Sequence, residues 1–383
     1  MPGGLPLPEH LASLVGVLAC PQEARALSLG QWDLLVRVSR GAKLAATLCD
    51  RLRADPGLQS IPDRPAAHLL SEHVVAEYQA QMVRLELRHV ELALGPLAAP
   101  VVLLKGAAYL LQDRPWARGR MLSDVDLLVP QDQLDAVERA LTAAGWASEV
   151  SDPYDQRYYR VFAHELPPMV RPGAALEIDL HHTLLPVSGR VHPNVRALFE
   201  TSEAIPGTRF HALCREDQIL HSAAHLFQDS DCADRLRDLV DLDGMLRDLG
   251  TEDAAWRTLL DRARLHELGR PLWYAVYFSR ALLGTPVPPP AVDALQSSAP
   301  GVVVRRLMDR LVPNALLPGD PDRLPPFRVQ VSEFLLYVRS MWLRMPPLVL
   351  LPHLARKAWR RFATARRDVA GAEGLDQSPA KQE

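Results

Sequence analysis

The sequence lacks an excess of positive charge and is poor in aromatic residues. Its 43 lysines and arginines are outnumbered by 46 aspartates and glutamates, the formal net charge is −3, and aromatic residues make up 6% of the chain. Nucleic-acid-binding surfaces usually carry a basic field, and single-stranded nucleic acid is often held on aromatic side chains. Because basic and aromatic residues are not interleaved here, nucleic acid is not an expected partner.

Cysteines and long apolar runs are also scarce. The four cysteines have no CxxC spacing, which argues against a structural zinc site and favours reduced thiols in the cytosol. The first residues contain acidic and polar breaks in place of a basic segment followed by an apolar one, so no signal peptide is expected. Residues 345–352 are apolar but too short and proline-broken to span a bilayer. We therefore expect a cytoplasmic protein without a transmembrane segment.

Helical periodicity dominates both ends of the chain. Apolar residues recur at helical spacing in segments before residue 95 and again after residue 211. We expect helices at residues 28–48, 66–94, 216–227, 234–249, 253–268, 271–283, 302–311 and 329–343, and a basic helix at 353–367.

Between these ends the pattern changes to short apolar runs separated by turns. It predicts strands at residues 101–104, 122–129, 158–166 and 174–181, another beginning at Trp146, and a helix at 132–144. The predicted fold class is α+β, with a small mixed sheet and helices flanked by helical regions. The expected divisions are an N-terminal helical region at 1–97, an α/β domain at 98–210, a C-terminal helical domain at 211–368 and a disordered tail at 369–383.

Asp124 and Asp126 are separated by one residue in the expected strand at 122–129. Side chains at positions i and i+2 of a strand share a face, so both carboxylates point the same way while Val125 and Leu127 point the opposite way. Two like charges this close repel, and a divalent metal ion is the usual reason for such a pair. A solvated turn is the common alternative, but the apolar flanks favour a metal site.

Two other segments extend the pattern. Upstream, the apolar residues 101–104 lead into Lys105 and Gly106, and a glycine lets the backbone approach a phosphate closely. Downstream, the strand at 174–181 places Glu177, Asp179 and His181 on one face, which leaves the identity of a third ligand open. Together the segments indicate a metal-dependent phosphoryl-transfer site.

Residues 103–108, Arg120 and residues 123–129 resemble an uncharacterised bacterial nucleotidyltransferase family, within the superfamily of nucleotidyltransferases similar to DNA polymerase beta. Residues 177–181, and Glu216 and Asp217 ahead of His225, are similar to later segments of that family. The resemblance implies a mixed sheet with helices on one side, Mg²⁺ held by three carboxylates, and transfer of a nucleoside monophosphate from an NTP to an acceptor.

Carried onto this chain, the resemblance implies that Asp124, Asp126 and Asp179 are the catalytic carboxylates and the ligands of Mg²⁺ or Mn²⁺. Asp179 is preferred to Glu177 because the family places an acid two residues before the histidine. The implied donor is an NTP, with ATP and transfer of AMP expected, and the acceptor is a small molecule or a protein or peptide.

The expected nucleotide-binding residues lie around the same turn: Lys105, Gly106, Ala107, Arg120 and Ser123. Lys105 and Arg120 would neutralise phosphate charge, Arg120 by a bidentate contact. A surface lysine and a solvated loop with Arg114 and Arg118 are the alternatives for these two residues. Ala107 stands where the superfamily often has serine or glycine, so the alternative function is a catalytically weak nucleotide-binding or partner-binding module.

Three other features leave alternatives open. His221 and His225 lie one helical turn apart with Asp217 and Asp229 on the same face, so a metal site for hydrolysis competes with the polar stripe at a domain junction that we favour. Asp238 and Asp241 are expected on a helix surface or between domains. The expected basic helix at 353–367 has two interpretations: packing against the protein with its cationic face exposed, or weak contact with an acidic membrane surface. We favour packing.

Overall fold

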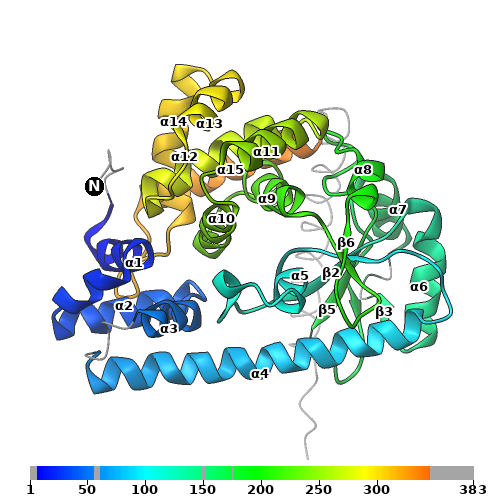
Figure 1. Ribbon diagram of the computed structural model, residues 1–383, viewed down its shortest axis with the longest axis horizontal. Helices are drawn as coiled ribbons and strands as arrows, with labels where there is room; N and C mark the ends of the chain where they lie inside the picture. Colours follow the sequence, from blue (N-terminus) through cyan, green and yellow to red (C-terminus); the bar gives the residue numbers. More distant parts are fainter. Residues whose placement is uncertain (1–6, 56–60, 149, 151, 175, 346–383) are drawn as a thin grey trace, which may run out of the picture.

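The computed structural model describes residues 7–55, 61–148, 150, 152–174 and 176–345. Within these ranges a mixed seven-stranded sheet is accompanied by many helices, which confirms the predicted α+β fold class. The long helix α4, Asp63–Leu94, runs beneath the molecule from the N-terminal helices to the sheet (Figure 1). The predicted basic helix at 353–367 and the predicted disordered tail lie outside the described residues, and the division into domains stays a prediction.

The N-terminal region is helical, as predicted. Its other helices are α1, Glu9–Ala19, α2, Leu29–Gly41, and α3, Ala45–Ala54. The single helix expected at 28–48 is two helices, because the chain turns at Lys43, whose φ is +55°. Ser28 begins α2 with a capping box: its hydroxyl accepts the Gln31 backbone N–H, and the Gln31 side chain accepts the Ser28 backbone N–H.

The sheet has the strand order β3-β4-β5-β2-β1-β7-β6. The strands are β1, Val102–Leu103, β2, Asp124–Leu128, β3, Ala147–Ser148, β4, Met169–Val170, β5, Glu177–His181, β6, Glu203–Ala204, and β7, His211–Ala212. β2 and β5 are parallel neighbours, and β1 pairs antiparallel with β2. The helices within this region are α5, Lys105–Leu111, α6, Leu134–Ala143, α7, Pro153–Phe162, and α8, Val195–Glu200.

The strand predicted at 158–166 is wrong for most of its length, because residues up to Phe162 belong to helix α7. Tyr158 and Phe162 lie four residues apart, so a helix brings their rings to one face, with 5.8 Å between ring centroids. Only Glu165 of the predicted segment forms a bridge to β5, opposite His181.

Strand alternation separates apolar from acidic side chains. Val125, Leu127, Ile178 and Leu180 are fully buried in the main hydrophobic core, to which α4 and α6 also contribute. Leu128, on the opposite face, belongs to a smaller core with Val102 and Leu104 and others. The acidic residues of β2 and β5 therefore share one face of the sheet, and that face becomes apolar at Leu128, the last residue of β2.

The C-terminal part contains every helix predicted there within the described residues. It runs through α9, Arg215–Ala224, a π-helical turn at His225–Asp229, α10, Leu236–Leu249, α11, Asp253–Leu265, α12, Gly269–Leu283, α13, Pro289–Leu295, α14, Val302–Leu316, and α15, Phe327–Arg344. These helices arch over the face of the molecule opposite α4 (Figure 1). None of the helices in the described ranges is both long enough and apolar enough to cross a bilayer.

The buried Asp217 in α9 forms an ion pair with Arg262 in α11 and so joins the two helices. Its two carboxylate oxygens accept hydrogen bonds from Arg262, and the Nε bond is 2.9 Å long. His266 Nε2 lies 3.3 Å from Asp217 Oδ1. Burial acts to raise the pKa of Asp217, but the contacts with His266 and Arg262 outweigh it and lower that pKa. Asp217 therefore belongs to a structural ion pair and not to a stripe shared with His221 and His225.

We predict that Asp217→Asn lowers the free energy of unfolding at pH 7 by about 3 kcal/mol, because Arg262 loses the charge that compensates it. The folded-state pKa of Asp217 lies below the unfolded value, so its contribution is present above about pH 4 and is lost as the pH falls through the folded-state pKa. Urea unfolding of both proteins across this pH range measures the difference.

Asp261→Asn is the matched control, because Asp261 pairs with Arg264 on the same helix and both side chains are at least 70% exposed. This variant should unfold at nearly the urea concentration of the parent chain. Equal effects of the two substitutions would contradict the structural role of Asp217.

Candidate active site

Three aspartates meet on one face of the sheet. The register of β2 and β5 pairs Asp126 with Asp179, and Asp124 lies two residues before Asp126 on the same face. A carboxylate oxygen from each of the three lies within 4.8 Å of the others. Glu177, the alternative left open by the sequence, is exposed at the start of β5 and does not belong to this group.

The electrostatic environment of the three aspartates is uneven. Burial, followed by the charges of Glu165 and Asp126, raises the pKa of Asp179 to about 7. Burial also acts to raise the pKa of Asp126, but Lys105 and His181 outweigh it and hold that pKa well below its usual value. The Oδ1 atom of Asp179 is buried without a hydrogen-bond partner. The negative charge of the group is therefore not fully compensated, and a bound cation would compensate it. The donor atoms are all oxygens, which suits Mg²⁺ or Mn²⁺.

Lys105 is the cation nearest the centre of this group. It stands at the turn from β1 into α5, with a φ of +43°, and its Nζ lies 3.4 Å from Asp126 Oδ1. Burial acts to lower the pKa of Lys105, but the charges of Asp126 and Asp124 outweigh it and raise that pKa. Lys105 is thus a charged lysine whose side chain is only 16% exposed, and not a snorkelling surface residue.

Gly106 lies against the side chain of Arg120. A Cβ atom at Gly106 would lie 2.2 Å from Arg120 Nη1 and 3.1 Å from Leu122 Cγ. Arg120 is partly buried, donates a 2.7 Å hydrogen bond from Nε to Asp241 Oδ2 and lies 5.8 Å from the centre of the Tyr109 ring. The close approach that requires glycine at position 106 is therefore to an arginine side chain of the same chain.

The three arginines of the predicted basic loop have different surroundings. Arg118 is exposed, with Nη2 3.8 Å from Asp113 Oδ2, and Arg114 lies 3.6 Å from Asp248 Oδ2. Arg120 alone is directed into the molecule, so the solvated-loop alternative does not describe it. Ala107 is 1% exposed and packs in the main hydrophobic core.

A polar cavity adjoins the aspartates. It is lined by the predicted residues Lys105, Arg120, Ser123 and Asp124, and by residues from α5, α9 and α10 and their ends: Tyr109, Ser222, His225, Arg235, Arg237, Asp238 and Asp241. A second cavity shares Ser123, Arg235, Arg237 and Asp238 with the first and continues past Lys43 and Arg37. Of the three aspartates, Asp124 thus faces a cavity with acidic and basic walls.

The residues that α10 contributes to this cavity were not predicted. Asp238 and Asp241 were expected on a helix surface or between domains, but they are 8% and 6% exposed and line the cavity. Arg235 donates a hydrogen bond of 3.2 Å to Asp238, and Arg120 donates to Asp241. The alternation of acidic and apolar residues in α10 is typical of any amphipathic helix, so the sequence alone does not reveal which face is covered.

His221 and His225 do not form a metal site with the other residues predicted beside them. Their ring centroids are 6.5 Å apart, and His225 Nδ1 lies 4.0 Å from Asp229 Oδ2. Burial and the charge of Lys105 lower the pKa of both histidines well below the usual value, so both are neutral. In the described part of the chain, neither residue belongs to a group of three candidate ligands.

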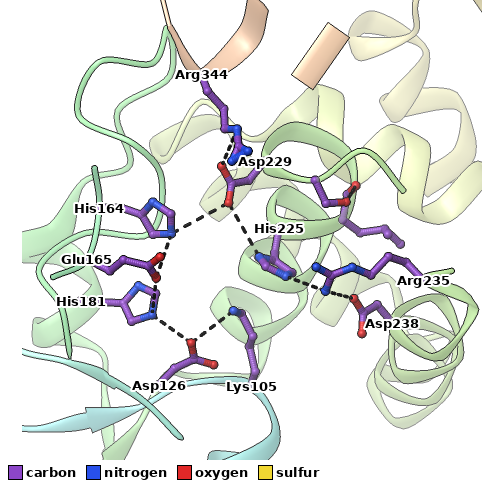
Figure 2. A network of polar contacts seen from close by, with 12 residues as sticks. Lys105, Asp126, His164, Glu165, His181, His225, Asp229, Arg235, Asp238 and Arg344 are labelled. Carbon is purple, nitrogen blue, oxygen red and sulfur yellow. Dashed lines mark hydrogen bonds and ion pairs between the residues drawn. The ribbon is translucent and has the colours of Figure 1, made fainter. Parts of the chain in front are cut away.

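A polar network continues from the aspartates into the molecule (Figure 2). His181 Nε2 lies 2.9 Å from Asp126 Oδ1 and 3.2 Å from Glu165 Oε2. His164 Nε2 lies 3.4 Å from the same oxygen of Glu165 and 3.9 Å from Asp229 Oδ2. Sequence reasoning missed His164 and Glu165, and their only local signal is the adjacent pair of ligand-type residues.

A family model described as uncharacterised nucleotidyltransferase matches residues 28–284, which is well over half of the chain. No curated protein and no solved structure matches. The matched segment contains all three aspartates, Lys105, Arg120 and the α10 wall of the cavity.

We predict that Gly106→Ala lowers the free energy of unfolding by about 1–3 kcal/mol, because the new Cβ must displace the Arg120 side chain, which its hydrogen bond to Asp241 holds in place. In an Arg120→Ala background the added cost of Gly106→Ala should be smaller, since the atom nearest the new Cβ is gone. Urea unfolding of the four proteins of this double-mutant cycle measures the coupling.

Gly30→Ala is the control for a generic glycine effect. No atom lies within 4 Å of a Cβ built at Gly30, which is in α2, so this substitution should leave the stability unchanged or increase it slightly. Additive costs of Gly106→Ala and Arg120→Ala would show that the two residues are not packed as described.

Proposed function

The chain belongs to the family of uncharacterised nucleotidyltransferases, and from this premise we propose that it uses Mg²⁺ or Mn²⁺ to transfer AMP from ATP to an acceptor. The acceptor class we propose is a small molecule or a protein or peptide side chain, in the cytoplasm. The single observation that carries this proposal is the meeting of Asp124, Asp126 and Asp179 beside a cavity, with a buried oxygen of Asp179 left without a partner.

The three carboxylates would hold the metal ion. When bound, the ion supplies charge that activates the acceptor oxygen and stabilises the triphosphate. Asp124 faces the cavity and would contribute on the nucleotide side, whereas Asp179 pairs with Asp126 in the adjacent strand. Burial, followed by the charges of Glu165 and Asp126, raises the pKa of Asp179 to about 7, and a cation at this point would offset the repulsion from those two carboxylates.

Four cationic side chains that line the cavity support a triphosphate site. Lys105 lies next to Asp126, Arg120 lines the cavity from the loop before β2, and Arg235 and Arg237 line it from the start of α10. Nucleotidyl transfer asks mainly for positioning and for neutralisation of phosphate charge. We propose that these four residues bind the phosphates and that Ser123 and the Gly106 turn complete the cradle.

The second cavity supports a location for the acceptor. It begins at the residues shared with the first cavity and extends between α2 and the segment around Pro318 to Pro321. An acceptor that enters there would approach the aspartates from the side opposite the sheet core. The mixture of Arg37, Lys43 and Asp234 on its walls favours a polar acceptor.

A second candidate function is a nucleotide-binding module that turns over weakly or not at all. The pairing of Lys105 with Asp126 favours it, because this lysine is then less free to bind a phosphate. The absence of a serine at position 107 does not favour it, because Ala107 packs in the hydrophobic core and does not line the cavity. Calorimetric binding of an NTP without pyrophosphate release, over a broad panel of acceptors, would distinguish this module from an enzyme.

We predict that Asp124→Asn, Asp126→Asn and Asp179→Asn each reduce pyrophosphate release by at least about a thousandfold and weaken Mg²⁺-dependent NTP binding, because each replaces one carboxylate oxygen by an amide nitrogen and removes the negative charge that holds the metal ion. The assay supplies each of the four NTPs with Mg²⁺ or Mn²⁺ and a lysate as the source of acceptors. ATP should be the preferred donor.

Asp132→Asn serves as the control, because Asp132 is exposed in the short 3₁₀ turn after β2 and lies outside the aspartate group. It should retain full turnover. Full activity in a chain that carries both the Asp124 and the Asp126 substitution would overturn the proposed function.

We also predict that Ala107→Ser does not increase turnover. Because Ala107 is 1% exposed within the hydrophobic core, a serine there buries a hydroxyl away from the cavity and should cost about 1–3 kcal/mol of stability. Thermal unfolding and initial rates of pyrophosphate release measure the two effects. A rise in turnover would show instead that a hydroxyl at this position reaches the phosphates.

A further inference from the structure

Three side chains with metal-binding atoms lie further along the acidic face of the sheet, at the end of β5. The proposed transfer reaction does not use them. His181 is the last residue of β5, Glu165 forms a bridge with it, and His164 precedes Glu165. The close-up shows the two imidazoles and the carboxylate side by side, with contacts between them (Figure 2). One ligand atom from each residue lies within 4.8 Å of the other two.

The spacing of these atoms agrees with a tetrahedral site. Glu165 Oε2 lies 3.2 Å from His181 Nε2 and 3.4 Å from His164 Nε2. Metal–ligand bonds of about 2.0–2.1 Å in tetrahedral geometry place neighbouring ligand atoms about 3.3 Å apart. The carboxylate oxygen therefore already stands at the required separation from both imidazole nitrogens.

The donor set selects a different ion from the aspartate group. Two imidazole nitrogens and one carboxylate oxygen are a common set for zinc, whereas Mg²⁺ prefers oxygen ligands only. Asp126 Oδ1, 2.9 Å from His181 Nε2, and Asp229 Oδ2, 3.9 Å from His164 Nε2, are carboxylate oxygens within reach of a fourth position. No cysteine is needed, so the scattered cysteines of the chain do not argue against this site.

Burial and charge also favour a cation at this point. The side chains of His181 and His164 are 1% and 12% exposed, and the Nδ1 atoms of both rings are buried without a hydrogen-bond partner. The polar contacts of both rings are therefore made through Nε2. Three carboxylates lie at this cluster, those of Asp126, Glu165 and Asp229. The two cationic side chains paired with them are Lys105 and Arg344, so negative charge exceeds positive charge.

We propose that His164, Glu165 and His181 bind a second metal ion of the zinc class, separate from the ion of the aspartate group. Such an ion ties the segment before β4 to the end of β5 and so fixes the inner edge of the acidic face. This site does not depend on the proposed function, because none of the contacts that define it involves a nucleotide. The competing occupant is a proton on His181, shared between Asp126 and Glu165.

The test uses the full chain after removal of metal with a chelator. It is titrated with Co²⁺ in an excess of Mg²⁺, which occupies oxygen-only sites and leaves the imidazole site free. We expect one Co²⁺ per chain, with the intense visible absorption of a four-coordinate ion, and loss of that absorption after addition of one equivalent of Zn²⁺. No bound Co²⁺, or the weak absorption of a six-coordinate ion, overturns the proposal.

Substitutions locate the ion. Glu165→Gln and His164→Gln should each weaken Co²⁺ binding by more than about 100-fold, because each removes a ligand. Asp179→Asn should leave the absorption intact, and so should His192→Gln, which removes an exposed histidine outside the cluster. Retention of the absorption in both ligand variants, or its loss in Asp179→Asn but not in His164→Gln, places the ion elsewhere and overturns the proposal.

Folding is followed separately by circular dichroism. Glu165→Gln is close in shape to the parent, and the Glu165 side chain is 27% exposed, so this variant should fold even if His164→Gln does not. In the parent chain Zn²⁺ should raise the midpoint of thermal unfolding, because the ion binds the folded state. A parent chain whose midpoint is unchanged by Zn²⁺ also counts against the site.

Discussion

The parallel pairing of β2 with β5 is the constraint on which the whole candidate site depends. Val125, Leu127, Ile178 and Leu180 are fully buried on one face of these strands, so the carboxylates must lie together on the other. A shift of the register by one residue would turn the carboxylates into the apolar core. Hydrophobic burial on one face thus opposes the repulsion between the charges on the other face.

The chain compensates these charges unequally. Lys105 and His181 both contact Asp126 Oδ1, whereas Asp179 has a buried oxygen without a partner and a pKa raised to about 7. Another ion pair, Arg120 with the buried Asp241, joins the loop before β2 to α10 and so connects the sheet with the C-terminal helices. Glycine at position 106 leaves the space that this arginine occupies.

The sequence predicted the parts of the site that depend on local periodicity. The i, i+2 spacing of Asp124 and Asp126 and the later strand with Asp179 follow from strand alternation, and α4 and the C-terminal helices from helical spacing. The places of Asp238 and Asp241 in the cavity could not be predicted, because helical spacing does not reveal that Asp241 lies against Arg120 from the loop before β2. His164 and Glu165 were missed because α7 replaces the strand expected there, and only the bridge at Glu165 brings them to His181.

Asp126 connects the two polar clusters of the acidic face. His181 Nε2 is 2.9 Å from Asp126 Oδ1, and the same nitrogen cannot donate a hydrogen bond and bind a metal ion at once. An ion on His181 would therefore remove one hydrogen-bond donor from Asp126 and leave Lys105 as its remaining partner in the network of Figure 2. Binding at the inner cluster and binding at the aspartates would then be coupled, and thermodynamic linkage requires this coupling to be the same in both directions.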